Sequence, residues 1–88
     1  MNLEARILAY VANNPGRGAN WTTLGTEYYE GSAAYAALRA DGRLVDGFAL
    51  SATGKKVRAA FVASDVGLSG LTRNDLDAIG AARRKAAR

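Results

Sequence analysis

The stretch ALRADGRLVDGFALSATGKKV, residues 37–57, holds the strongest constraint on how this chain can fold. A helix-like run ends at Gly42, because glycine readily adopts the left-handed conformation that follows a helix. The pair Asp46-Gly47 then separates two short apolar segments and favours a two-residue type I′ turn, which would set Val45 opposite Phe48. Such a short ribbon is not stable alone and must pack against helices. The stretch therefore predicts a mixed (α+β) fold, mainly α with a small β-hairpin.

A first helix is expected near the N-terminus. Leu3, Ile7 and Val11 share one helical face, and Asn2 is a suitable N-cap. The helix should stop at Asn14-Pro15-Gly16, because the residue before a proline avoids the α conformation.

Two further helices are expected before the hairpin. The second covers residues 22–30, a turn follows at Gly31, and Ser32 caps the third helix, residues 33–41. These segments predict a three-helix core that packs against the hairpin.

The segment after the hairpin is expected to be helical. Ser51 is a suitable N-cap for a fourth helix, in which Val57, Ala60 and Phe61 would share a face. The sequence thus predicts one domain over residues 1–64.

The C-terminal part is expected to form a linker and a basic helix. Residues 65–71 contain several small residues and predict a linker, and residues 72–88 a helix with a frayed basic tail. Thr72 to Asp75 resembles a capping box, and Leu76 and Ile79 offer an apolar contact for a homodimer.

Composition limits the chemistry that the chain can perform. The 88 residues include no cysteine and no histidine, so the commonest nucleophile, general base and transition-metal ligands are missing. Its eight acidic residues show no spacing typical of an acid/base pair or a metal site, so we expect no enzyme, no cofactor and no bound metal. No apolar run approaches the roughly 18 residues of a membrane span. We therefore expect a cytoplasmic protein.

Positive charge gathers in the second part of the chain. Residues 1–52 carry four basic and five acidic side chains, whereas residues 53–88 carry eight basic and three acidic ones. This distribution favours a polyanionic partner, although basic residues on surface helices can also serve solubility alone.

The order of the expected elements resembles a winged helix-turn-helix domain. The motif Leu38-Arg39-Ala40-Asp41-Gly42-Arg43-Leu44, followed by Leu50-Ser51-Ala52-Thr53-Gly54, is similar to a pattern in MarR- and PadR-type transcription regulators. The resemblance implies that the third helix enters the major groove of double-stranded DNA and that the hairpin, the wing, approaches its backbone. It implies a small DNA-binding protein, a transcription regulator or a phage-encoded or bacterial accessory factor.

The resemblance and the distribution of charge together give the candidate DNA-binding residues. The third helix has one basic residue and the expected wing tip is acidic, so phosphate contacts from the following helix and the tail are easier to support than base reading. The candidates are Ser32, Ala33, Ala36, Arg39 and Arg43 from the resemblance, and Lys55, Lys56, Arg58, Arg83, Arg84 and Lys85 from the charge.

A different class of function remains open on the same fold. The alanine-rich third helix and the acidic wing tip at Asp46-Gly47 would also suit a neutral docking face. In that case the domain would be a protein–protein interaction module without intrinsic DNA binding.

Overall fold

The computed structural model describes residues 2–17, residue 24 and residues 28–87. It combines helices with one two-stranded antiparallel hairpin, so the expected mixed α+β class is confirmed. The elements are α1 (Leu3–Asn13), α2 (Tyr28–Ala40), β1 (Leu44–Leu50), β2 (Lys56–Val62), the 3-10 helix η1 (Ala63–Gly70) and α3 (Arg73–Ala86).

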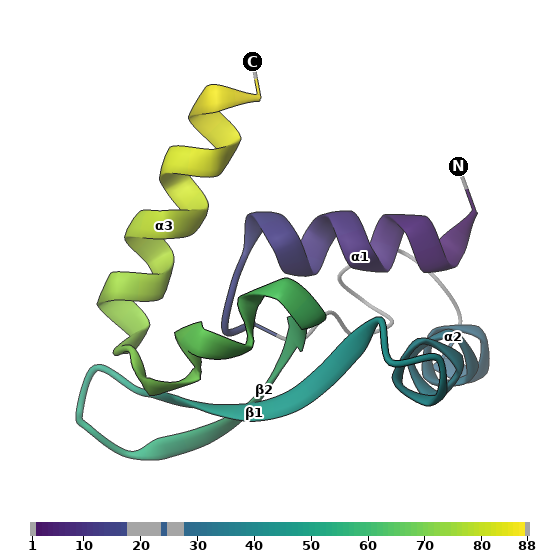
Figure 1. Cartoon of the computed structure of the whole chain (residues 1–88), viewed down its shortest axis with the longest axis horizontal. Coiled ribbons are helices and arrows are strands. Elements are labelled where there is room, and N and C mark those ends of the chain that lie inside the picture. The colour runs from purple at the N-terminus through teal and green to yellow at the C-terminus, as the bar shows by residue number, and fades with distance from the viewer. Residues whose placement is uncertain (1, 18–23, 25–27, 88) are drawn as a thin grey trace.

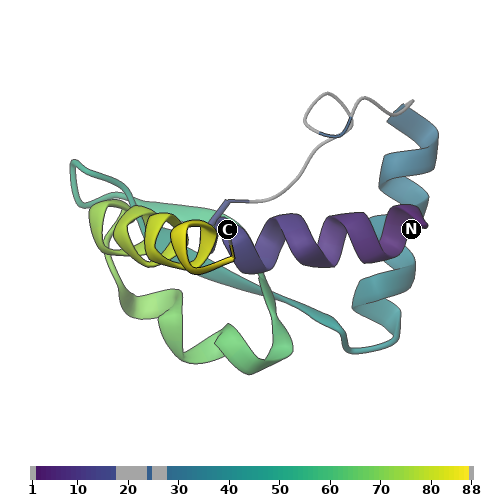
Figure 2. The same cartoon turned by 90° about the horizontal axis from the view of Figure 1, so that it is seen from above.

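The hairpin is the centre of the arrangement. Helices α1 and α2 cross at one end of it, η1 runs along it, and α3 lies toward its other end (Figures 1 and 2). In the described part of the chain, no helix is long and apolar enough to cross a membrane.

Helix α1 begins and ends where the sequence predicts. The Asn2 side chain accepts a hydrogen bond of 2.8 Å from the Ala5 amide, which satisfies one free N–H of the first turn. At the other end, the Asn14 amide and side chain both donate to the Tyr10 carbonyl, at 2.9 and 3.1 Å, just before Pro15.

The turn expected at Gly31 is wrong, because α2 runs without a break through Gly31 and Ser32. Gly31, Ala34 and Leu38 are buried and follow the i, i+3, i+7 spacing of one helical face. Packing of this face therefore outweighs the local turn preference of glycine and the capping preference of serine. Most of the helix expected over residues 22–30 lies outside the described residues.

The end of α2 is as predicted at Gly42. Its φ of 74° is left-handed, its N–H donates to the Arg39 carbonyl, and the Arg43 N–H donates to the Leu38 carbonyl. These two bonds form a Schellman motif, which turns the chain from the helix into β1.

The hairpin exists, but the position predicted for its turn is wrong. Strand β1 continues straight through Asp46 and Gly47, and Val45 pairs with Phe61 instead of Phe48. A side chain at Gly47 would have its Cβ 3.2 Å from both the Phe61 ring and the Ser69 Cβ. Gly47 therefore permits close packing against the strand and is not a turn residue.

The helix predicted from Ser51 onward is also wrong, since β2 occupies residues 56–62. Ser51 instead organises the hairpin turn: its N–H donates to the Lys55 carbonyl at 2.8 Å, and its hydroxyl accepts from the Lys55 N–H at 3.1 Å. The turn therefore spans residues 51–55 and places two consecutive lysines at the end of the hairpin.

Two core clusters hold the elements on opposite faces of the hairpin. The first joins α1, α2 and the base of β1, and consists of Ile7, Val11, Ala34, Leu38 and Leu44. The second joins the hairpin to α3, and consists of Ala49, Ala59, Phe61 and Leu76.

The segment expected as a linker is helical and packed. Residues 63–70 form η1, and Leu68 and Leu71 lie against the second core cluster. The Leu71 carbonyl accepts a hydrogen bond of 3.2 Å from the Leu50 N–H, which ties this segment to the edge of β1.

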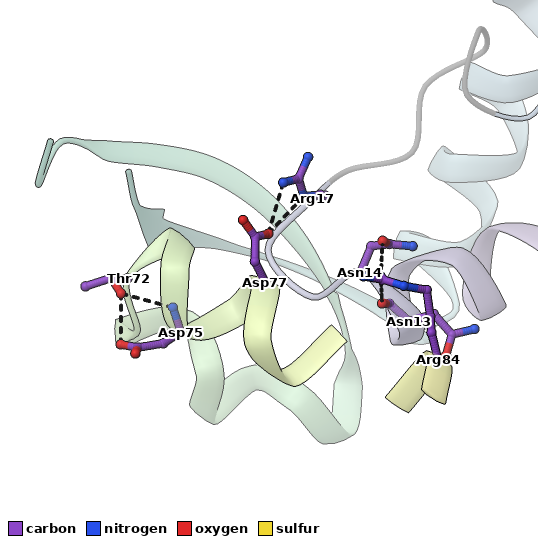
Figure 3. Close-up of polar contacts among 7 residues, drawn as sticks. All are labelled: Asn13, Asn14, Arg17, Thr72, Asp75, Asp77 and Arg84. Atoms are coloured by element: carbon purple, nitrogen blue, oxygen red, sulfur yellow. Dashed lines mark hydrogen bonds and ion pairs between the residues drawn. The ribbon is translucent and has the colours of Figure 1, made fainter. Parts of the chain in front are cut away.

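Helix α3 begins at the predicted cap. The Thr72 hydroxyl accepts from the Asp75 N–H at 3.2 Å and donates to the Asp75 carboxylate at 2.8 Å (Figure 3). The frayed tail is wrong as far as Ala86, because residues 83–86 continue the helix.

Candidate nucleic-acid interface

The register of the hairpin separates its two faces. Side chains of directly paired residues point to the same side of a sheet, and the sides alternate along each strand. One side of the hairpin is covered by the second core cluster. The residues on this side that belong to the cluster or pack on it are Val45, Ala49, Val57, Ala59 and Phe61.

The opposite side is open beyond the base of the hairpin. Leu44 and Val62 pack with the first core cluster, and the side chains that follow are mostly exposed. We call this surface the open hairpin face. It consists of Asp46, Phe48, Leu50, Lys56 and Arg58.

Ion pairs join α2 to the open hairpin face. The Asp46 carboxylate lies 3.5 Å from an Arg39 guanidinium nitrogen and 3.9 Å from one of Arg58. One carboxylate thus faces two cations, and the Arg58 side chain is 79% exposed. Exposed pairs of this kind contribute about 0–1 kcal/mol, so both guanidinium groups can exchange Asp46 for another anion at little cost.

Phe48 lies among these charges. It is 51% exposed, Arg58 is its partner across the strands, and the Lys56 ammonium lies 5.6 Å from the centre of its ring. The sequence prediction missed this residue, because it placed Phe48 beside a turn rather than in the middle of a strand. Phe48 and Leu50 are two residues apart, so in a continuous strand their side chains point to the same side of the sheet. This alternation would have placed Phe48 on the open hairpin face.

The turn at residues 51–55 completes the basic surface. Lys55 and Lys56 are exposed, and no acidic residue occurs between Ser51 and Val62. The acidic wing tip expected from Asp46-Gly47 is therefore wrong, and the end of the hairpin is basic. Basic side chains thus follow the hairpin from Arg39, which pairs with Asp46, to Lys55 in the turn.

The remaining candidates from α2 are also exposed. Ser32, Ala36 and Arg39 follow the i, i+4, i+7 spacing and share one helical face, and Ala33 adjoins it. Arg43 is exposed where the chain passes from α2 to β1. The helix face that carries Arg39 is thus continuous with the open hairpin face.

Two of the C-terminal candidates have a different role. Arg83 donates to the Ala12 carbonyl at 2.7 Å and to the Asp65 carboxylate at 2.8 Å. The hydrogen bond to Asp65 raises the pKa of Arg83, because it stabilises the charged guanidinium. The Arg83 side chain therefore joins α3 to the end of α1 and to η1.

Arg84, the next residue, also joins α3 to the end of α1. Its guanidinium donates to the Asn13 carbonyl at 2.7 Å and to the Asn14 side-chain oxygen at 2.6 Å (Figure 3). These bonds satisfy an acceptor at the C-terminus of α1, where positive charge also suits the helix dipole. Lys85 is exposed on the end of α3, which projects away from the hairpin (Figure 1).

Two further side chains make contacts within the molecule. Arg17 bonds to the Asp77 carboxylate at 3.0 Å, which holds the loop after α1 against α3 (Figure 3). Leu76, expected at a dimer contact, is only 1% exposed and lies in the second core cluster. Among residues 2–17, 24 and 28–87, no group of three or more acidic side chains could hold a metal ion.

Comparison of the chain with protein-family models, with curated proteins and with solved structures gave no match.

Proposed function

We propose that this protein binds double-stranded DNA as a winged helix-turn-helix domain. In this proposal, α2 is the helix that enters the major groove and the β1–β2 hairpin is the wing. The exposed face of α2, with Ser32, Ala36 and Arg39, lies toward the bases. A role in transcription regulation, or as an accessory factor to another DNA-binding protein, follows from the same resemblance.

The observation that carries the proposal is the chain of contacts from α2 to the hairpin. Arg39 and Arg58 share Asp46, and Lys56 lies over Phe48, the cross-strand partner of Arg58. Cations from two elements are thus placed along one surface with a single carboxylate between them. Such a surface attracts the closely spaced phosphates of a duplex.

The interaction-module alternative has lost one of its two supports. It was based on an alanine-rich helix face and an acidic wing tip, and the hairpin in fact ends in Lys55 and Lys56. The alanine-rich face of α2 remains, but a polyanion matches the adjoining basic hairpin better than a neutral protein surface does.

A salt titration tests the proposal. Binding of the protein to a fluorescent duplex is measured by anisotropy at several salt concentrations. The log–log slope should be about −0.9 for each phosphate neutralised, and Lys56→Ala should reduce its magnitude by about one unit.

Lys85→Ala is the matched control, because it removes the same charge from the far end of α3. It should leave the slope nearly unchanged. No binding of the wild-type protein at low salt would overturn the proposal, as would equal effects of the two substitutions.

A further inference from the structure

Phe48 has surroundings that the binding of phosphates alone does not explain. Single exposed apolar residues are common and need no function by themselves. Phe48, however, is 51% exposed on a strand, with the Lys56 ammonium 5.6 Å from its ring centre and Arg58 directly opposite. An exposed aromatic side chain thus lies beside the Lys56 ammonium and is paired across the strands with Arg58.

This combination matches the chemistry of a nucleotide. The face of an aromatic ring stacks on a nucleobase, and cations beside it bind the phosphates on either side. The Lys56 side chain is flexible, so its ammonium can leave the ring for a phosphate when a base takes its place. Arg58, 79% exposed, is similarly free to exchange its 3.9 Å pair with Asp46.

We propose that Phe48 stacks on an unpaired base, while Lys56 and Arg58 hold the adjacent phosphates. The proposal deepens the DNA-binding function above and rests on it. The ring lies on the face of a sheet, where a base inside an intact duplex cannot reach it. The preferred ligand is therefore a duplex that contains an unpaired base, such as a bulge or the junction with a single strand.

The test compares a fully paired duplex with the same duplex that carries one bulged thymidine. The wild-type protein should bind the bulged duplex about 5- to 100-fold more tightly, the range expected for one stacked base. Phe48→Ala and Phe48→Leu should abolish this preference, so that each variant binds the bulged and the paired duplex with equal affinity. Phe48→Tyr, which keeps an aromatic face, should retain the preference.

Oligothymidylate and oligouridylate distinguish the two sources of an unpaired base. Binding of oligothymidylate but not of oligouridylate assigns the site to DNA. Equal binding of both oligonucleotides assigns it to unpaired bases of either nucleic acid. Phe48→Ala should weaken binding in both cases.

Three results would overturn the inference. Equal wild-type affinity for the paired and bulged duplexes would contradict the stacking of Phe48 on a base and leave the proposed DNA-binding function unaffected. Failure to bind any of the oligonucleotides would remove both. A dimer in sedimentation that Phe48→Ala dissociates, with the bulge preference unchanged, would show that the ring instead packs against a second copy.

Discussion

The two phenylalanines of this chain lie on opposite faces of the same hairpin, and they differ in burial and in the residues that surround them. Phe61 is completely buried beneath α3, beside Leu76. Phe48 is half exposed, with the Lys56 ammonium near its ring and Arg58 as its partner across the strands. One face of the hairpin thus completes the second core cluster, and the other is largely exposed beyond its base. The same division separates the arginines, because Arg83 is held by α1 and η1 whereas Arg58 extends into solvent.

Substitution of the two phenylalanines should give the largest contrast. Phe61→Ala leaves a cavity in the second core cluster and should lower the free energy of unfolding by about 3–5 kcal/mol. Phe48→Ala should lower it by less than about 1 kcal/mol, because the ring has few packing contacts to lose. Urea denaturation followed by circular dichroism measures both. Equal losses would mean that the two faces of the hairpin are not distinct.

Substitutions of Arg83 and Arg58 should show the same contrast, with smaller changes in the free energy of unfolding. Arg83→Ala removes the partner of Asp65, whose side chain is only 11% exposed, along with a bond to the end of α1. The Arg83 side chain is itself 37% exposed, so solvent screening limits the expected loss to about 1–2 kcal/mol. Arg58→Ala should change the free energy of unfolding by less than about 0.5 kcal/mol.

DNA affinity should respond to these two substitutions in the reverse order. Arg58→Ala should weaken binding, and Arg83→Ala should leave it unchanged at temperatures where the variant remains folded. Weaker binding from Arg83→Ala alone would place the interface on α3.

Substitution of the shared carboxylate should change DNA binding only modestly. Asp46→Asn removes the charge that pairs with Arg39 and Arg58, and should tighten DNA binding by roughly 3- to 10-fold at low salt. Anisotropy titration measures this gain, which added salt should diminish. Weaker binding would indicate that Asp46 positions the two arginines rather than competing for them.

Local signals predicted the ends of several elements correctly. Asn2, Gly42 and Thr72 each bond to backbone within a few residues, so their roles as caps or turn residues can be inferred from nearby sequence. The turn of the hairpin could not be inferred in this way. Val57, Ala60 and Phe61 fit a helical face as well as a strand, and only pairing with β1 decides between them.

Contacts between distant parts of the chain explain the rest. The carbonyls that Arg83 and Arg84 bond are 71 residues away, so nothing near these arginines indicates that they are structural. The distribution of charge identified Lys55, Lys56 and Arg58, but it could not separate them from the arginines of α3. Phe48 was missed because its exposure depends on which face η1 and α3 cover.

The most direct test of the interface is an NMR titration of the labelled protein with duplex DNA. We expect the backbone amide signals of Arg39, Lys56 and Arg58 to shift most, and those of Arg83 and Arg84 to stay nearly unchanged. Shifts concentrated at the end of α3, with the open hairpin face unaffected, would contradict the proposal that this face binds DNA.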